Sequence, residues 1–295
     1  MLQSESLSDR IIARFDAMSP QLQLAARHVL ENPQEVALVS MRRLARSAGV
    51  QPATMTRLAQ FLGLTGYEDI RAHYSEAIRL RADGFAARAR ERDTAAPGAQ
   101  GGLAQQMLQG LASQVARLSE PQSLARLQAV ADHLIRADKI YVLGLRSCHS
   151  VAWHFHYVMT LLGEKTVHLD GPAGTGADGL LRSDAQDVLL AISVSPYCVQ
   201  TLELADLARA KGMTVVSITD SEVSPLIAIS EVSILFSIES QTFFHTLTPA
   251  LAISEVLCGL IADNDRHAAL DALQRADRHL QMLKTYANTI PHRRI

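Results

Sequence analysis

The second half of the chain carries the sequence pattern that most constrains the fold. After Ala137, short apolar runs alternate with segments of helical character, and polar loops separate them. The runs are KIYVLG (139–144), KTVHL (165–169), DVLLAIS (187–193), MTVVSIT (213–219) and EVSILFS (231–237). Short β-rich runs that alternate with helices are typical of a parallel sheet covered on both faces. The pattern therefore predicts a doubly wound, five-stranded parallel-sheet domain of the α/β class.

The first ninety residues show helical periodicity only. Ser19 offers an N-cap oxygen and Pro20 a proline at the first position of a helix. We expect this helix to end at about Glu31, before the Asn32-Pro33 pair. Further helices are expected from Ser40, after Val50, and from Tyr67 to about Arg81. This half is therefore predicted to be an all-helical domain.

A stretch without charge, TAAPGAQGG (94–102), separates the two patterns and is rich in small residues, glycine and proline. We predict a helical domain over residues 1–93, a linker over 94–102 and a sheet domain over 103–295. The fold class is thus α + α/β. Helices of the second domain are expected at about 103–118, 122–136, 150–162, 199–211, 245–262 and 265–285.

Composition narrows the location and the partners of the chain. Its three cysteines are too few and too widely spaced for a disulfide framework or a zinc site, which indicates a reducing compartment. No apolar run approaches the roughly 20 residues of a membrane span, and the polar amino terminus is unlike a secretory signal. We therefore expect a cytoplasmic protein without a membrane partner. The net charge is −2, yet residues 40–92 contain ten arginines and only five acidic residues.

Residues 40–62, SMRRLARSAGVQPATMTRLAQFL, have the pattern of a helix-turn-helix, which we place at 41–62. Each of the two expected helices has an apolar face at i, i+3, i+4 and i+7. Gly49 lies between them, where a sharp turn needs a left-handed residue. Val50 follows in the angle between the helices, and Pro52 suits the first turn of the second helix. Two short helices joined by a glycine turn are typical of DNA-binding proteins.

The outward face of the second helix has the chemistry that DNA recognition requires. The spacing places Ala53, Arg57 and Gln60 away from the apolar face, with Thr54 and Thr56 beside them. Small side chains allow a close approach to the groove, arginine pairs with guanine, and glutamine pairs with adenine. With Arg46 as a further cation, the candidate DNA-binding residues are Arg42, Arg43, Gln51, Ala53, Thr54, Thr56, Arg57 and Gln60.

The same segment resembles the amino-terminal domain of RpiR-type bacterial transcriptional regulators. The matching residues are ENPQEVALVSMRRLARSAGVQPATMTRLAQFLGLTGYEDIR (31–71). They include the Asn-Pro pair, the Leu-Ala and Gly-Val pairs, Pro-Ala-Thr and the Leu-Gly…Gly-Tyr pattern. The resemblance implies a regulator that binds double-stranded operator DNA.

Two loops at the ends of expected strands are rich in serine. GLRSCHS (144–150) follows the first strand and SVSPYC (193–198) follows the third. In open parallel sheets ligands bind at the carboxyl ends of strands, where loops meet helix amino ends. Hydroxyl and N–H donors gathered there would bind a small anion. Helix capping by these serines is the alternative interpretation.

Residues 138–240 are similar to a sugar isomerase (SIS) domain, the usual second half of RpiR-type regulators. The similarity rests on the Gly-x-x-Ser loop, on Asp-Val-Leu-Leu-Ala-Ile-Ser-Val-Ser and on Ile-Thr-Asp…Ser-Pro-Leu (218–226). It implies dimerisation, as a homodimer or a dimer of dimers, and a sugar phosphate held by Ser147, Ser193 and Ser195. The candidate effector-binding residues are Arg146, Ser147, Cys148, Ser193, Ser195, Tyr197 and Glu255.

The second loop departs from the family pattern. Where the family commonly has Ser-x-Ser-Gly-x-Thr, this chain has Pro196 in the glycine position and Cys198 in the threonine position. Proline has no N–H group, so one anion donor is lost, and the thiol of Cys198 is only a weak donor. In the first loop Cys148 replaces a serine, and Arg146 adds a cation. A phosphate and another anion, such as a carboxylate, both remain open as ligands.

No cofactor or metal is expected. GTGADG (174–179) does not lie directly between a strand and a helix, so we interpret it as a flexible loop. His154 and His156 would point in different directions on a helix, and His149 lies two turns from His156. Glu255 lies in an otherwise apolar helix, where it would contact the ligand, lie at a dimer contact or be a buried structural carboxylate.

These features favour a regulator of a catabolic operon whose operator affinity is controlled by a small anionic metabolite, and which is not an enzyme. The alternative is a sugar-phosphate aldose–ketose isomerase, which would need a base beside the serine loops. Glu255 and His245 are the candidates for that base. A scaffold protein would leave the serine loops unexplained.

Overall fold

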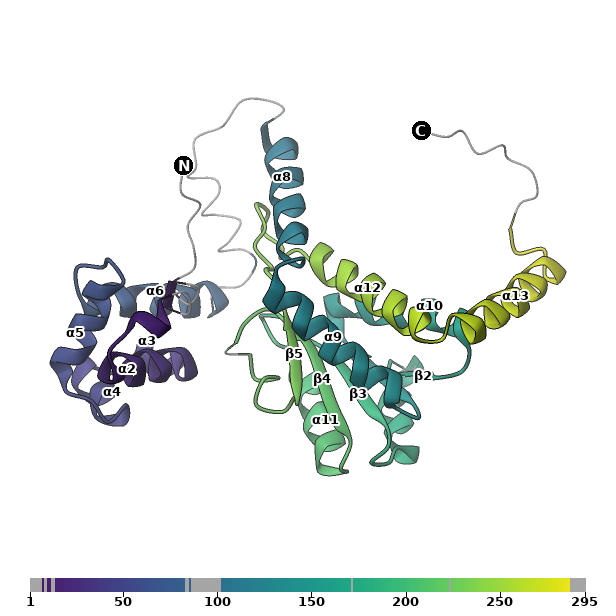
Figure 1. The fold of residues 1–295 in the computed structure, drawn as a ribbon, viewed down its shortest axis with the longest axis horizontal. Coiled ribbons are helices and arrows are strands. Elements are labelled where there is room, and N and C mark those ends of the chain that lie inside the picture. The colour runs from purple at the N-terminus through teal and green to yellow at the C-terminus, as the bar shows by residue number, and fades with distance from the viewer. Residues whose placement is uncertain are drawn as a thin grey trace. The chain divides into compact units, whose positions relative to one another are not determined.

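The computed structural model describes residues 14–82, 102–170, 172–222 and 224–286, and the separate positions 7, 10, 11 and 85. The chain divides into two compact units, one made of residues 1–100 with 241–244 and the other of 101–240 with 245–295. Their elements are labelled in Figure 1. Of the linker predicted at 94–102, only Gly102 lies within the described residues, where it begins helix α8.

The described part of the first unit is helical. Its elements are η1 (Phe15–Ala17), α2 (Pro20–Glu31), α3 (Pro33–Leu38), α4 (Met41–Ser47), α5 (Pro52–Phe61) and α6 (Tyr67–Ala82). Pro20, Pro33 and Pro52 each occupy the first helical position, where a missing N–H group costs nothing. Side chains from several of these helices form one core, in which Leu44, Met55 and Ile70 are fully buried.

Two details of the first unit differ from the sequence-based expectation. Asn32-Pro33 ends one helix as expected, but Pro33 also begins α3, a short helix that the prediction omits. Ser19 precedes α2 with extended backbone but makes no side-chain cap hydrogen bond. Both differences lie at the ends of α2, where tertiary context overrides local preference.

The second unit contains the predicted five-stranded parallel sheet, with strand order β2-β1-β3-β4-β5. The strands are β1 (Ile140–Gly144), β2 (Thr166–His168), β3 (Val188–Ile192), β4 (Thr214–Thr219) and β5 (Val232–Leu235). The chain leaves β1 toward β2 and then returns to the other side of β1 as β3. This reversal places the topological switch point between β1 and β3, where open α/β sheets bind ligands.

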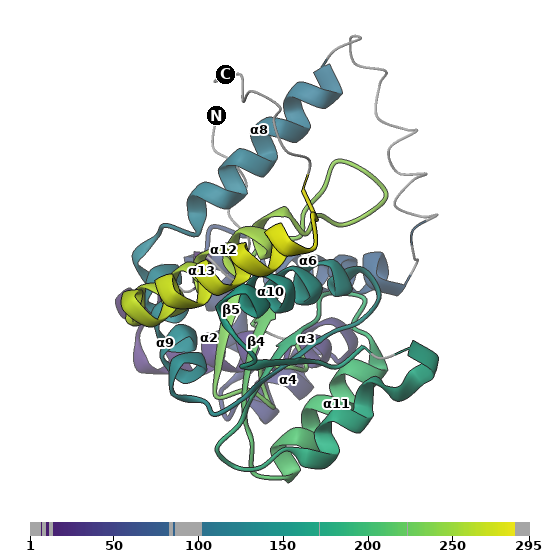
Figure 2. The same ribbon diagram turned by 90° about the vertical axis from the view of Figure 1, so that its right-hand side faces the viewer.

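The helices of the second unit are α8 (Gly102–Arg117), α9 (Pro121–Arg136), α10 (His149–Leu162), α11 (Val199–Ala210), α12 (Thr248–Asn264) and α13 (Arg266–Met282), with a 3-10 stretch η3 (Pro172–Arg182). Four of these helices, α9, α10, α11 and α12, cover the two faces of the sheet. Figures 1 and 2 show α9, α10 and α12 on one face of the sheet and α11 on the other. None of the described helices is long and apolar enough to cross a membrane.

The alternation of side chains along the central strands explains these two layers. Val142 and Leu190 face a core shared with α9, α10 and α12, and Leu143 and Leu189 face a second core that includes residues of α11. Burying a large aliphatic side chain contributes about 1.5–3 kcal/mol. Strands buried on both faces therefore consist almost entirely of apolar residues, which is the pattern that the sequence shows.

The segment GTGADG is not the flexible loop that the sequence analysis predicts. It lies within η3, the 3-10 stretch that follows β2. Gly179 packs so closely that an added Cβ would lie 2.7 Å from Leu169 Cδ2. Leu180, which follows, is buried in the second core, so burial of this leucine anchors the segment against the sheet.

Candidate functional site

The helix-turn-helix consists of α4 and α5. Gly49 joins them with φ +67°, the left-handed conformation that the sequence analysis assigned to it. The Val50 amide donates to Ala45 O at 2.9 Å and closes the turn. The Val50 side chain is itself buried in the core of the first unit, which fixes the angle between the two helices.

Most of the candidate DNA-binding side chains lie on the surface. Gln51, Ala53, Arg57 and Gln60 are exposed on and just before α5, and so are the three arginines of α4. Thr56 is half-buried, and its hydroxyl donates to Met41 Sδ at 3.6 Å. The exposed face of α5 therefore presents small, amide and guanidinium side chains together.

Thr54 is a correction to this set. The structure buries it to 7% exposure, so it does not belong to the outward face. Residues four positions apart lie on the same side of a helix, and Leu58 is fully buried. Thr54 therefore packs with Leu58 in the core and supports α5 from inside.

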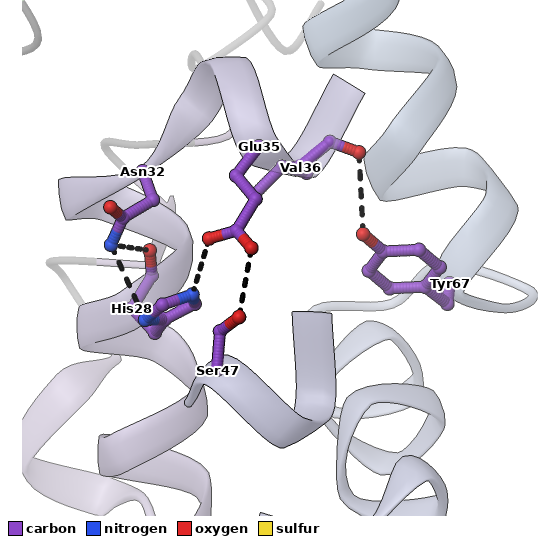
Figure 3. A network of polar contacts seen from close by, with 6 residues as sticks. All are labelled: His28, Asn32, Glu35, Val36, Ser47 and Tyr67. Atoms are coloured by element: carbon purple, nitrogen blue, oxygen red, sulfur yellow. Dashed lines mark hydrogen bonds and ion pairs between the residues drawn. The ribbon is translucent and has the colours of Figure 1, made fainter. Parts of the chain in front are cut away.

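A polar network supports α4 from behind (Figure 3). The Glu35 carboxylate of α3 accepts from Ser47 Oγ at 2.8 Å and lies 3.2 Å from His28 Nε2 of α2. Asn32 Nδ2 completes it by donating to the His28 carbonyl oxygen at 3.1 Å. One carboxylate thereby connects three helices and fixes the end of α4 that leads into the turn.

Three further hydrogen bonds position these helices, and none of them was predicted from the sequence. The Tyr67 hydroxyl donates to Val36 O at 3.3 Å, and burial raises the pKa of Tyr67 to about 12, so it remains a donor at neutral pH. Arg14 Nη1 donates to Phe61 O at 3.0 Å, and Arg10 Nη1 to Leu62 O at 3.4 Å. Cations at the carboxyl end of α5 satisfy its last carbonyls and oppose its dipole.

In the second unit, the loop after β1 is tightly constrained. Arg146 is exposed and has φ +58°, a conformation that costs energy for a residue with a side chain. Ser147 and Cys148 follow in η2 (Arg146–Cys148) and lead directly into α10. A Cβ on Gly144 would lie 2.7 Å from Cys148 O, so only glycine allows the loop to fold back this closely.

A histidine from a distant segment meets this loop. His245, which lies between β5 and α12, is buried to 8% exposure, and its Nε2 lies 2.9 Å from Ser147 Oγ. The sequence analysis considered His245 only as a base for the isomerase alternative. No local pattern indicates the contact, because the two residues are 98 positions apart.

The loop after β3 brings Ser193 and Ser195 to the same edge of the sheet. Both side chains are buried, and the Ser195-Pro196 peptide bond is cis. Thr219 Oγ1, at the end of β4, donates to Ser193 O at 2.8 Å. Tyr197, which follows Pro196 in the same loop, is half-buried.

The two serine loops and the end of β4 lie near one another. Burial, with smaller contributions from nearby Asp220 and Cys198, raises the pKa of the Cys148 thiol to about 11, although hydrogen bonds from Val194 and Ser147 oppose the shift. Cys148 is therefore a neutral thiol at physiological pH and a poor nucleophile. Asp220, which directly follows β4, was not among the candidates, although its place at a strand end is a signal that could have found it.

Glu255 lies on the surface of α12. It lies exposed on α12 between Ser254, which is fully buried, and Val256, which is 44% exposed. The interpretation as a buried structural carboxylate is therefore wrong. Exposure follows from helix geometry, because α12 buries the side of Ser254 and Leu257 and turns Glu255 outward.

The histidines near Cys148 each have a separate partner. His154 Nδ1 lies 2.9 Å from Ser254 Oγ, and His156 Nδ1 lies 2.8 Å from Thr166 Oγ1. His149 Nδ1 lies 2.5 Å from Asp170 Oδ2. Among the described residues, no group of three or more His, Cys, Asp or Glu side chains is arranged to hold a metal ion.

The geometry defines a two-domain protein with a helix-turn-helix and a doubly wound domain that gathers hydroxyl groups at its switch point. Two family models match this division. The helix-turn-helix domain of the rpiR family matches residues 8–79, and the SIS domain matches residues 133–258. The chain therefore has the domain pair of an RpiR-type transcriptional regulator, an rpiR-family helix-turn-helix domain followed by a SIS domain.

Named relatives agree with this assignment. The chain is 24% identical over 221 residues to the HTH-type transcriptional regulator HexR of Pseudomonas aeruginosa, with 73% of each protein covered. It is also 24% identical over 218 residues to the bifunctional protein glk of Burkholderia mallei, covering 74% of this chain but 33% of that longer protein.

Solved structures show the same fold. The Vibrio vulnificus NanR protein, complexed with ManNAc-6P, aligns with a TM-score of 0.56 and 21% identity, covering 96% of this chain and 100% of NanR. The sugar isomerase domain of an RpiR transcription factor from Sphaerobacter thermophilus aligns with a TM-score of 0.55 and 22% identity, covering 60% and 98%.

Proposed function

We propose that this protein binds operator DNA through α4 and α5 and that a small anionic metabolite, a sugar phosphate or a similar compound, controls its affinity for that DNA. The operator would belong to a catabolic operon. The observation that carries the proposal is the exposed face of α5, which presents Ala53, Arg57 and Gln60 on a helix-turn-helix.

The chemistry of this face supports contacts with base edges. The Arg57 guanidinium has the geometry to bond guanine O6 and N7 together, and Gln51 or Gln60 can pair with adenine. Ala53 adds no bulk between the helix and the groove. Arg42, Arg43 and Arg46 of α4 are exposed as well and would bind phosphates, which contribute affinity without sequence preference.

The switch point of the sheet supports the effector half of the proposal. Ser147, Ser193 and Ser195 lie on the loops after β1 and β3, and exposed Arg146 adds a positive charge beside them. Hydroxyl groups and a cation favour an anion over a neutral ligand. Structural relatives that include a ManNAc-6P complex of NanR favour a phosphorylated sugar.

A dimer would complete the regulator. The mutually packed helices α10, α12 and α13 expose large apolar side chains, at Trp153, Tyr157, Leu251, Val256, Leu270 and Leu273. Several large exposed apolar side chains on packed helices favour an interface, and a second copy is the partner that a two-fold operator requires. Each recognition helix would then reach a half-site about one turn of DNA, roughly 34 Å, from the other.

The direct test is a gel shift with the DNA upstream of the protein's own gene, over a salt series and with a panel of sugar phosphates. We expect selective retention that weakens with salt and is relieved by one of the phosphates. A Ser195→Ala variant should bind DNA normally without ligand but respond less to it. Absence of selective retention would contradict the regulator proposal.

The isomerase is the second candidate function. The position of His245, 2.9 Å from Ser147 Oγ, favours it, because this places a base beside the serine loop. The same sugar phosphates should therefore be assayed for aldose–ketose conversion. Turnover without selective DNA retention would favour the isomerase, whereas the regulator relatives favour a role without catalysis.

A further inference from the structure

His245 and Ser147 lie outside the two apolar cores of the second unit. Their contact joins segments 98 positions apart through buried or half-buried polar groups. Burying an imidazole costs free energy unless it is hydrogen-bonded. This contact lies at the expected ligand site, because Ser147 belongs to the loop after β1, at the switch point of the sheet.

The hydrogen-bonding capacity of serine determines what the contact can do. A hydroxyl has one hydrogen to donate and two lone pairs that accept. If His245 Nε2 carries a hydrogen and donates it to Ser147 Oγ, the hydroxyl hydrogen of Ser147 remains available for an anion. If Ser147 donates instead, that hydrogen is already used. Only the first arrangement prepares Ser147 to bind an anionic oxygen.

The surroundings favour the first arrangement. The nearby Asp220 carboxylate disfavours an anion at the serine loops, so a fixed orientation of the remaining donors matters more there. Because Pro196 removes one donor and Cys198 weakens another relative to the family pattern, Ser147 contributes a larger share of the remaining donor set. A partner that fixes its orientation compensates for part of that loss.

We propose that His245 is a positioning residue of the effector site: it donates from Nε2 to Ser147 Oγ and so directs the Ser147 hydroxyl toward the anionic group of the effector. This rests on the proposed effector function of the serine loops. The ligand class is a phosphate ester or a carboxylate, and inorganic phosphate and acetate are the probes that separate these two.

The test is a double-mutant cycle on the full chain, with phosphate and acetate titrations measured by calorimetry at constant ionic strength. The variants are Ser147→Ala, His245→Leu, His245→Gln and the Ser147→Ala/His245→Leu double variant. We expect His245→Leu to weaken anion binding about fivefold, the size of one hydrogen bond. His245→Gln should recover most of it, since its amide also donates. In the Ser147→Ala background, His245→Leu should leave the anion affinity unchanged.

A second measurement does not depend on the variants. Long-range 1H–15N spectra of the wild-type chain should show the Nε2–H tautomer of His245 before any anion is added. The Nδ1–H tautomer, additive losses in the cycle, or a His245→Leu variant that binds like the wild type would each overturn the proposal.

These outcomes separate this inference from the proposed function. Anion binding that Ser195→Ala weakens but His245→Leu does not would refute the role of His245 and leave the effector site intact. A wild-type chain that binds neither anion but retains DNA would refute both the effector site and the positioning role. A cycle that behaves as expected in a chain without selective DNA binding would support His245 and contradict the regulator.

Discussion

Arg57 is the residue whose role follows most directly from its position on α5. It is exposed between Leu58, which is fully buried, and half-buried Thr56, so its guanidinium reaches outward. A bidentate contact with guanine is worth about 1–3 kcal/mol of discrimination. We predict that Arg57→Ala reduces the preference for the operator over random DNA at least tenfold and leaves the fold unchanged.

Footprinting with competitor DNA measures this change, and circular dichroism checks the fold. Arg275→Ala is the matched control, because Arg275 is an exposed arginine on α13 in the other unit. A variant at Arg57 with wild-type selectivity would show that α5 does not read the bases. Equal losses in both variants would indicate a general effect of charge.

Gly144 is a second residue for which the structure predicts the effect of a substitution. An added Cβ would lie 2.7 Å from Cys148 O and 2.8 Å from Ala152 Cβ, and neither atom is at the end of a flexible side chain. We predict that Gly144→Ala destabilises the second unit by about 1–3 kcal/mol, the usual cost of overpacking. It should also weaken anion binding, because the loop with Ser147 must shift.

Urea unfolding followed by the fluorescence of Trp153, the single tryptophan of the chain, measures the loss. Gly259→Ala on α12 is the control. A Cβ there meets nothing within 4 Å, and alanine favours a helix, so this variant should be stabilised by up to about 1 kcal/mol. Similar stabilities for the two variants would contradict the crowding at Gly144.

At the scale of elements, helix α10 and edge strand β2 share a cluster of imidazole rings. His168 stacks on His156 with 5.5 Å between ring centroids, and Trp153 meets His168 edge-on. Burial lowers the pKa of His168, and the charges of His156 and His149 lower it further, whereas Asp170 opposes the shift. Burial also lowers the pKa of His156.

These shifts predict that the second unit loses stability in mild acid. Both imidazoles bind a proton more weakly when folded, so the unfolded chain takes up more protons once the pH falls below about 6.5. The free energy of unfolding should therefore decrease from pH 7 to pH 5.5. His168→Gln should flatten this dependence, and His267→Gln, at an exposed site on α13, should not.

Trp153 fluorescence is the appropriate probe, since the indole belongs to the cluster and reports on this unit. An equal pH slope in the wild type and in His168→Gln would show that other groups govern the acid response.

The strands show where prediction from the sequence succeeds. The strand ends were predicted to within one or two residues, because each strand is an apolar run with a polar loop on either side, and the loops mark where the strand can begin and end.

At the scale of the whole molecule, the proposed dimer makes a prediction of its own. The packed helices α10, α12 and α13 expose Leu251 and Val256 among other apolar side chains. We predict that Leu251→Glu/Val256→Glu reduces the mass in solution to that of a monomer and weakens operator binding more than tenfold, since both half-sites are then no longer bound together.

Light scattering with size-exclusion chromatography measures the mass. Leu207→Glu is the control, because Leu207 is 49% exposed on α11, which covers the opposite face of the sheet. A dimer that survives the double substitution, or one that Leu207→Glu disrupts, would place the interface elsewhere. Neither result would affect the proposed roles of the α5 face and the serine loops.

The sequence by itself determined the elements and the periodic faces, including the exposed Arg57 and the glycine turn at Gly49, because these depend on spacing along the chain. The tertiary structure alone decided which distant groups meet. It buried Thr54, exposed Glu255, organised GTGADG as a 3-10 stretch and brought His245 to Ser147. Local periodicity fixes the direction of a side chain relative to its own helix, whereas its burial and its partner depend on how separate segments pack.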